Sequence, residues 1–104
     1  MARILVVDDE EIILQMLCVL LSGEKHEVIP VKDGETAIAL IRSDELFDLL
    51  ITDLRMSPVD GMEVLAAAKE SRPSMPGIVV SAYYSEKNFQ KTKALGCSIF
   101  VKKP

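Results

Sequence analysis

The sequence contains few of the residues on which many catalytic and binding sites depend. Its single histidine, His26, has no second candidate ligand nearby, so we expect neither a histidine-based metal site nor a catalytic histidine. The two cysteines, Cys18 and Cys97, are too few for a disulfide framework. Their mostly apolar or small neighbours indicate core residues of a protein kept in a reducing compartment.

Excess positive charge and long apolar runs are also lacking. The net charge is −4 and the sequence pI is near 4.9, which argues against a nucleic-acid-binding surface. The longest apolar stretch, residues 12–21, is interrupted by Gln15 and is too short to span a bilayer. The N-terminal apolar run ends in acids and has no signal-peptide architecture. We therefore expect a cytoplasmic protein that binds neither nucleic acid nor membrane directly.

What the sequence does contain is a regular alternation of strand-like and helix-like segments. The 104 residues are 49% hydrophobic, which suits one small domain spanning 1–104. Strands are predicted at 4–7, 26–31, 49–52, 77–80 and 98–101, and helices at 11–21, 35–42, 62–71 and 85–95. This alternation predicts an α/β fold, namely a flavodoxin-like, doubly wound, five-stranded parallel sheet in the order 2-1-3-4-5.

The helices are one fewer than such a sheet normally carries, because no fifth helix follows the last strand. The helix at 11–21 is also apolar around nearly its whole circumference, whereas a surface helix shows one apolar stripe. Both features predict that one face of the sheet is poorly covered. Either the chain is a domain truncated before its fifth helix, or a partner replaces that helix.

Acidic and basic residues follow the predicted strands. Asp8 and Asp9 end the first strand, Asp53 ends the third, Ser81 the fourth, and Lys103 follows the fifth. The order 2-1-3-4-5 brings these ends to one crevice. Clustered carboxylates repel one another and require a cation, and oxygen ligands favour Mg²⁺. The lysine suggests an anion such as a phosphoryl group, which a carboxylate can carry as an acyl phosphate.

Two simpler interpretations of these residues stay open at this stage. Asp8 or Asp9 is also a suitable cap for the helix that follows. Lys102 competes with Lys103 for the site, although alternation along a strand sends neighbouring side chains to opposite faces, so only one of them can point into the crevice.

The chain resembles the receiver (phosphoacceptor) domains of two-component response regulators from Arg3 to Pro104. The resemblance rests on motifs that follow one another at family-like spacing: Val6-Val7-Asp8-Asp9-Glu10, Asp53-Leu54-Arg55-Met56 leading to Asp60-Gly61, Ser81-Ala82-Tyr83, Ala94-Leu95-Gly96-Cys97, and Lys103-Pro104. It implies a phosphorylation-activated signalling switch and not an enzyme. Self-phosphorylation from small donors and self-dephosphorylation would be the only reactions of its own.

The resemblance also implies a role for each site residue. Asp53 would accept a phosphoryl group from a sensor histidine kinase or a phosphotransfer protein. Mg²⁺ would be bound by Asp9, Asp53 and the backbone carbonyl of Arg55, with Asp8 acting mainly through water. Ser81 and Lys103 would bind the phosphoryl group. Ser81 and Phe100 would switch the surface between strands four and five, which controls an output domain or partner in a longer parent protein.

Three departures from the family pattern carry expectations of their own. Ser57 stands where the family usually has a proline and Pro58 follows, so we expect an altered loop with retained chemistry. Arg55 and Tyr83 occupy positions that tune phosphoryl lifetime, and their bulk predicts slow self-dephosphorylation. The apolar surface left without a fifth helix would favour a homodimer. The Lys103–Pro104 bond would resemble the family's cis peptide.

Two other functional classes fit less well. A Mg²⁺-dependent phosphatase of the haloacid-dehalogenase type would use Asp53 as nucleophile but needs a second aspartate two residues later, where Arg55 stands. A nucleotide- or flavin-binding module would need a phosphate loop rich in glycine or hydroxyl residues after the first strand. The Asp-Asp-Glu-Glu sequence at 8–11 repels phosphate unless a metal intervenes.

Overall fold

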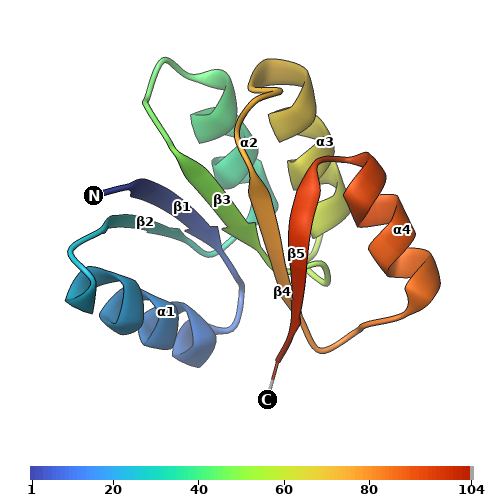
Figure 1. The fold of residues 1–104 in the computed structure, drawn as a ribbon, viewed down its shortest axis with the longest axis horizontal. Coiled ribbons are helices and arrows are strands. Elements are labelled where there is room, and N and C mark those ends of the chain that lie inside the picture. The colour runs from blue at the N-terminus through green and yellow to red at the C-terminus, as the bar shows by residue number, and fades with distance from the viewer. Residues whose placement is uncertain (104) are drawn as a thin grey trace.

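The computed structural model describes residues 1–103 and contains five parallel strands in the order β2-β1-β3-β4-β5 (Figure 1). The elements along the chain are β1 (Arg3–Val7), α1 (Glu11–Gly23), β2 (Glu27–Val31), α2 (Gly34–Arg42), β3 (Leu49–Thr52), α3 (Gly61–Ser71), β4 (Gly77–Ser81), α4 (Glu86–Ala94) and β5 (Cys97–Lys102). The predicted fold class, strand order and four helices are confirmed. Boundaries differ by one or two residues.

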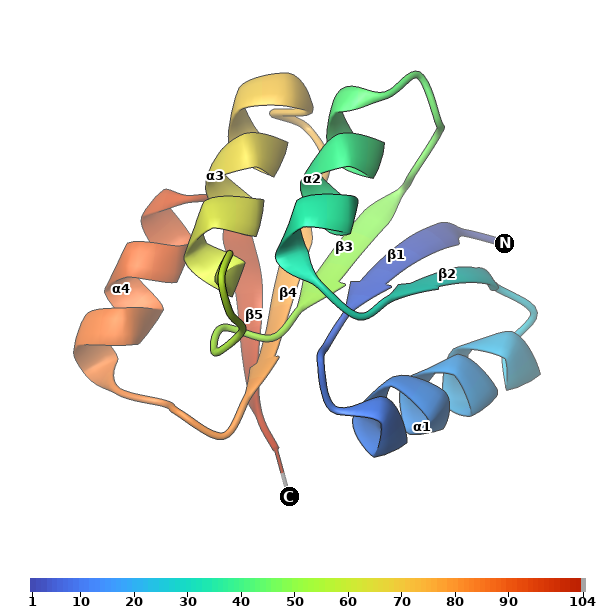
Figure 2. The ribbon, with the colours of Figure 1, turned by 180° about the vertical axis from the view of Figure 1, so that it is seen from behind.

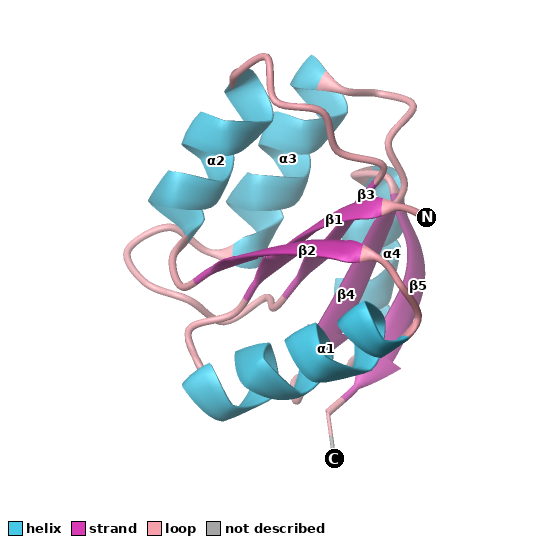
Figure 3. Ribbon diagram, turned by 90° about the vertical axis from the view of Figure 1, so that its left-hand side faces the viewer, coloured by secondary structure: helices cyan, strands magenta, loops and turns pink. Residues whose placement is uncertain are grey.

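The helices lie on both faces of the sheet. Helices α2 and α3 lie side by side on one face (Figure 2), α1 covers β1 and β2 from the opposite face (Figure 3), and α4 lies beside β5. Leu5 and Val7 of β1 point into the core beneath α2 and α3, whereas Ile4 and Val6 face Leu14 of α1. Central strands are therefore apolar on both faces, which explains their unbroken runs of Ile, Leu and Val.

The face shared with α1 is incompletely covered over β4 and β5. Ile99 and Val101 of β5 are 53% and 44% exposed, and the neighbouring Ile78 and Val80 of β4 are only partly buried. This agrees with the expectation that one face is poorly covered. No helix within residues 1–103 is both long enough and apolar enough to cross a membrane.

Candidate functional site

Four strands deliver polar side chains to one end of the sheet. Asp8 directly follows β1, Asp53 directly follows β3, Ser81 is the last residue of β4, and Lys103 directly follows β5. The sheet hydrogen bonds continue to these positions, because the Asp53 N–H donates to the Val7 carbonyl at 2.9 Å and the Lys103 N–H to the Ser81 carbonyl at 2.9 Å. The four side chains therefore stand on backbone whose position the sheet fixes.

The Lys103 ammonium group lies among three carboxylates. Its Nζ is 3.0 Å from Asp8 Oδ2, 2.6 Å from Glu10 Oε1 and 3.2 Å from Asp53 Oδ2. The side chains of Lys103, Asp8 and Asp53 are only 4%, 2% and 4% exposed, whereas Glu10 is 60% exposed. Burial acts to lower the pKa of Lys103, but hydrogen bonds to Glu10 and Asp8 and the charge of Asp53 outweigh it and raise the pKa. Lys103 is thus fully protonated at neutral pH.

Asp8 is the most deeply buried of these carboxylates. Burial raises its pKa above the ordinary value, and the charge of Asp53 raises it further, while the Glu10 N–H and Lys103 oppose the shift. The Glu10 N–H donates to Asp8 Oδ1 at 2.9 Å, which leaves Oδ2 directed at Lys103. Asp8 is therefore oriented by the N-cap residue of α1 and by the lysine together.

The start of α1 differs from the prediction. Glu10, and not Asp8 or Asp9, is the N-cap residue, and its side chain makes no capping hydrogen bond. Instead the side chain turns to Lys103, 93 residues away in the sequence. Asp8 is buried and forms an ion pair with Lys103, which favours the site interpretation of this residue over the cap. Sequence reasoning missed Glu10 as a site residue, and the only signal was its place beside the Asp8–Asp9 pair.

The acidic side chains fit a hard divalent cation. Among the described residues, carboxylate oxygens of Asp8, Glu10 and Asp53 lie within 4.8 Å of one another. All are oxygen donors, as Mg²⁺ prefers. Asp9 is exposed and does not belong to this group of three in the described chain, although it adjoins both Asp8 and Glu10.

Ser81 and Tyr83 border the same end of the sheet. Ser81 is fully buried, and its Oγ accepts a hydrogen bond from the Tyr83 N–H at 3.1 Å. The Tyr83 ring is half exposed and stacks with Arg55, whose guanidinium carbon lies 4.2 Å from the ring centre. This cation–π contact joins the segment after β3 to the segment after β4.

Phe100 belongs to an aromatic cluster beside α4. Its ring packs edge-on against Tyr84 with centroids 5.2 Å apart, and lies 6.4 Å from the ring of Phe89 on α4. Phe100 is half-buried and also touches the core beneath α2 and α3. The cluster thus connects β5 with α4 and with the loop that precedes it.

The loop between β3 and α3 is held tightly against Asp53. Asp60 caps α3 by accepting the Glu63 N–H at 3.0 Å. A Cβ on the next residue, Gly61, would lie 1.9 Å from the Asp53 carbonyl oxygen, so only glycine fits there. The Ser57–Pro58 bond in this loop is cis. The cis bond expected at Lys103–Pro104 involves a residue outside the described range.

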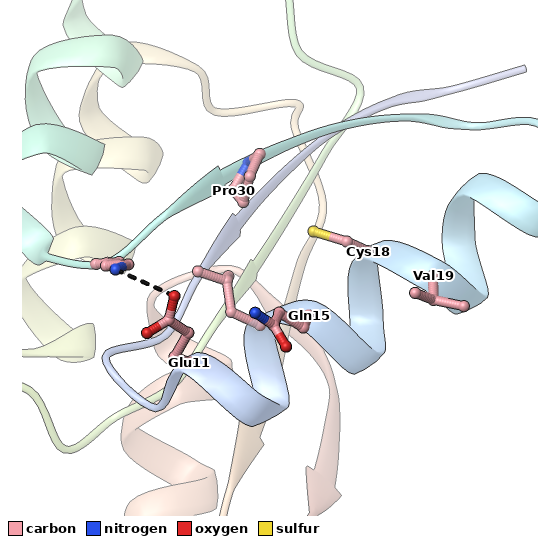
Figure 4. Close-up of a pocket in the computed structure, with 7 residues that line it drawn as sticks. Glu11, Gln15, Cys18, Val19 and Pro30 are labelled. Carbon is pink, nitrogen blue, oxygen red and sulfur yellow. Dashed lines mark ion pairs between the residues drawn. The ribbon is translucent and has the colours of Figure 1, made fainter.

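A pocket of about 470 Å³ lies elsewhere, between α1 and β2. Figure 4 shows Cys18 of α1 and Pro30 of β2 facing into it. Glu11, which also lines the pocket, forms an ion pair with Lys32 at 3.4 Å. Apart from Glu11, Lys32 and Gln15 its lining is apolar, and it contains none of the residues that surround Lys103. Asp8 and Lys103, whose pKa values are shifted by burial together with specific charged partners, lie in the acidic crevice, so the crevice is the better candidate site.

Comparison with known proteins agrees with the geometry. The family model of the response regulator receiver domain matches residues 4–104, and the chain belongs to this family of two-component signalling domains. Such domains are phosphoacceptor signalling domains and not enzymes in the usual sense. Related curated proteins include the transcriptional regulatory protein GlrR of Escherichia coli, 31% identical over 103 residues, which are 99% of this chain and 23% of that protein. The chain thus spans about a quarter of that relative's length.

Solved structures with the same fold extend the comparison. A CheY-like receiver domain protein from Methanospirillum hungatei is 32% identical with a TM-score of 0.93, covering 100% of this chain and 82% of that one. The response regulator TrrA from Thermotoga maritima, solved in complex with Mg²⁺ and BeF, is 30% identical with a TM-score of 0.88, covering 100% and 88% of the two chains. The family is therefore shown over residues 4–104, and the fold over the residues that the structure describes.

Proposed function

We propose that this domain is a phosphorylation-activated switch in which Asp53 accepts the phosphoryl group. The observation that carries the proposal is the buried Asp53 carboxylate, which is bonded to Lys103 and adjoins Asp8. A carboxylate oxygen of Asp53 attacks the phosphorus of a phosphohistidine on a sensor kinase or phosphotransfer protein. A P–O bond forms, the P–N bond breaks, and the histidine nitrogen keeps the electron pair.

Magnesium fits this site because the donors are carboxylate oxygens. Asp9, Asp53 and the carbonyl of Arg55 are the proposed direct ligands, with Asp8 acting through water. When bound, the ion would offset the negative charge of the phosphoryl oxygens and of the clustered acids. Asp9 can join the ligands by turning its exposed side chain toward the group formed by Asp8, Glu10 and Asp53.

Ser81 and Lys103 are the proposed donors to the phosphoryl group. Lys103 already donates to Asp53 at 3.2 Å, and the Ser81 hydroxyl at the end of β4 accepts from Tyr83 while keeping its own O–H available. The domain samples inactive and active arrangements, and phosphorylation favours the one in which Ser81 bonds the phosphoryl oxygens. Movement of Ser81 makes room for Phe100, whose contacts with Tyr84 and Phe89 pass the change to α4.

The output surface would be the β4–β5 side of the domain with α4. A surface of few buried contacts can rearrange at low cost, and Thr92 is the single fully buried residue of α4. The change would control an output domain in a longer parent protein or a separate partner, in the cytoplasm and without direct contact to nucleic acid or membrane. A homodimer through the uncovered β4–β5 face is a further proposed assembly.

Arg55 and Tyr83 are proposed to slow the loss of the phosphoryl group. Their stacked side chains connect the segments after β3 and β4, next to Asp53 and Ser81. Self-dephosphorylation requires a water molecule to approach the phosphorus opposite the Asp53 oxygen. A stacked pair of large side chains obstructs that approach more than small residues would.

Intact-mass analysis after incubation with acetyl phosphate and Mg²⁺ tests the phosphoacceptor. We expect one added phosphoryl group that requires Mg²⁺ and disappears in Asp53→Asn. The Asp44→Asn variant, which alters an exposed aspartate between α2 and β3, is the matched control and should be phosphorylated normally. An adduct that persists in Asp53→Asn, or its absence from the folded wild-type chain, would contradict the proposal.

A further inference from the structure

The ammonium group of Lys103 has as many carboxylate partners as it has N–H donors. An ammonium carries three N–H groups, and oxygens of Asp8, Glu10 and Asp53 lie 3.0, 2.6 and 3.2 Å from its nitrogen. Under the proposed function, Lys103 must also bond an oxygen of a phosphoryl group carried by Asp53. The ammonium donates hydrogen bonds to Glu10 and Asp53 and forms an ion pair with Asp8, so a phosphoryl oxygen has to compete with these carboxylates for it.

Glu10 is the partner that can leave at the lowest cost. Asp8 is buried, so releasing it from Lys103 would leave an unpaired charge away from water, and Asp53 stays beside the lysine through the phosphoryl group that it carries. Asp8 is also fixed by the Glu10 N–H at 2.9 Å. The Glu10 side chain is 60% exposed, and water can solvate its carboxylate as soon as the contact breaks. A phosphoryl group on Asp53 adds negative charge beside Glu10, which further weakens the contact.

The position of Glu10 in the fold supports the same conclusion. It is the N-cap of α1, yet its side chain accepts no hydrogen bond from the helix backbone. Glutamate is a poor N-cap residue compared with aspartate or serine. The contact with Lys103, at 2.6 Å the shortest of the three, is the one ion pair of this side chain within residues 1–103. The side chain of Glu10 is therefore engaged with the lysine and not with the helix.

We propose that Glu10 is a latch for the unphosphorylated state: it occupies the place on Lys103 that a phosphoryl oxygen takes. The latch holds the ammonium group beside Asp53 and competes with the phosphoryl group for it. Glu10 is thus a positioning residue that sets how tightly the site binds a phosphoryl group. This inference rests on the proposed function of Asp53 and Lys103.

Binding of beryllofluoride, a mimic of the phosphoryl group, tests the latch. Titration in the presence of Mg²⁺ is followed by the amide NMR signals of Ser81 and Lys103. We expect Glu10→Gln to bind beryllofluoride about two- to fivefold more tightly than the matched variant Glu11→Gln, since loss of an exposed ion pair has an effect of that size. Glu11 is the neighbouring acid and pairs with Lys32 at 3.4 Å, so Glu11→Gln removes the same charge without touching Lys103.

The possible results separate the latch from the proposed function. If wild-type protein binds beryllofluoride but Glu10→Gln binds it no more tightly than Glu11→Gln, the latch is wrong and the function stands. If the folded wild-type protein fails to bind it, both are wrong.

A separate titration with Mg²⁺ alone compares the Mg²⁺ affinity of Glu10→Gln with that of Glu11→Gln. We expect the two affinities to be equal. Weaker Mg²⁺ binding in Glu10→Gln than in Glu11→Gln would make Glu10 a metal ligand and overturn the latch. Glu10→Ala should reproduce the result of Glu10→Gln.

Discussion

The Lys103 ammonium donates to Asp53 Oδ2 at 3.2 Å across 50 residues of sequence. The two residues follow β5 and β3, which are separated in the sheet by β4. Both side chains are almost completely buried, so the contact is part of the fold as well as of the site. A lysine in this position offsets the charge of Asp8 and Asp53 and at the same time supplies a donor where a phosphoryl group would be held.

Replacement of Lys103 should therefore destabilise the domain in a way that a cation can reverse. We expect Lys103→Met to lower the free energy of unfolding by about 3 kcal/mol, because two buried carboxylates lose their partner. Added Mg²⁺ should restore part of this loss through binding to the same acids. Denaturant unfolding with and without Mg²⁺ measures both effects. The exposed neighbour Lys102 provides the control, since Lys102→Met should change stability by no more than about 0.5 kcal/mol. Equal losses in the two variants would contradict the prediction.

Gly61 should tolerate no side chain, because a Cβ would lie 1.9 Å from the Asp53 carbonyl oxygen. We expect Gly61→Ala to displace the loop that carries Asp53, to lower the free energy of unfolding by about 2 kcal/mol or more, and to abolish Mg²⁺-dependent phosphorylation. Gly23 at the end of α1 has nothing within 4 Å of the corresponding position. Gly23→Ala should be neutral or stabilising by up to about 1 kcal/mol. Denaturation and intact-mass analysis compare the two, and a phosphorylated, stable Gly61→Ala would refute the close-packing argument.

Removal of the Tyr83 ring should shorten the life of the phosphorylated form. The ring stacks with Arg55 at 4.2 Å, and without it water has freer access to Asp53. Decay of the phosphorylated protein, followed by intact mass after removal of the donor, should be about two- to fivefold faster in Tyr83→Ala, as expected for loss of one cation–π contact. Tyr83→Phe keeps an aromatic face and should decay at the wild-type rate. An unchanged rate in Tyr83→Ala would exclude a role for this side chain.

The strands and the residues that end them could be predicted from sequence for one physical reason. Short runs such as Ile4–Val7 and Leu49–Ile51 are apolar without interruption, which is typical of a strand buried on both faces. A charged residue directly after such a run has to lie at the carboxyl end of its strand, where the side chain can leave the apolar core. Topology then brings the carboxyl ends of parallel strands together, so Asp8, Asp53 and Lys103 could be grouped without knowledge of any side-chain contact.

The contacts made by exposed side chains could not be predicted in the same way. Glu10 lies in a run of four acids, and nothing in that run reveals which carboxylate reaches a lysine 93 residues away. The stacking of Arg55 on Tyr83 likewise depends on how two loops approach each other in the folded domain. Local capping preference alone would have made Asp8 a cap of α1, but tertiary contacts fix its side chain, so its place at the end of a strand was the better guide to its role.

Asp33 is the N-cap residue of α2, and protonation of its carboxylate should lower the free energy of unfolding of the domain. Its pKa is lowered from the ordinary 3.8, first because the Thr36 N–H donates to its carboxylate and then because the Thr36 hydroxyl does so. A lowered pKa means that the stabilisation is present above 3.8 and is lost as the pH falls through the lowered value. Asp33→Asn keeps the capping acceptor but does not titrate. The stability of wild type relative to Asp33→Asn, from denaturation at each pH, should thus be constant above about pH 5 and decrease as the pH falls below 3.8. A constant difference would refute this linkage.

The uncovered face of β4 and β5 should cause self-association. Ile99 and Val101 are 53% and 44% exposed on a sheet face where Ile78 and Val80 are also incompletely covered. Burying these side chains against a second copy removes apolar surface from water, and loss of one such side chain should raise the dimer dissociation constant about tenfold. Sedimentation velocity over a range of concentrations compares wild type with Ile99→Ser. Ile12 is 80% exposed on the outer side of α1, and Ile12→Ser should associate like wild type. If the wild-type chain stays monomeric at high concentration, or if Ile12→Ser weakens association as much as Ile99→Ser, this face is not the contact between copies.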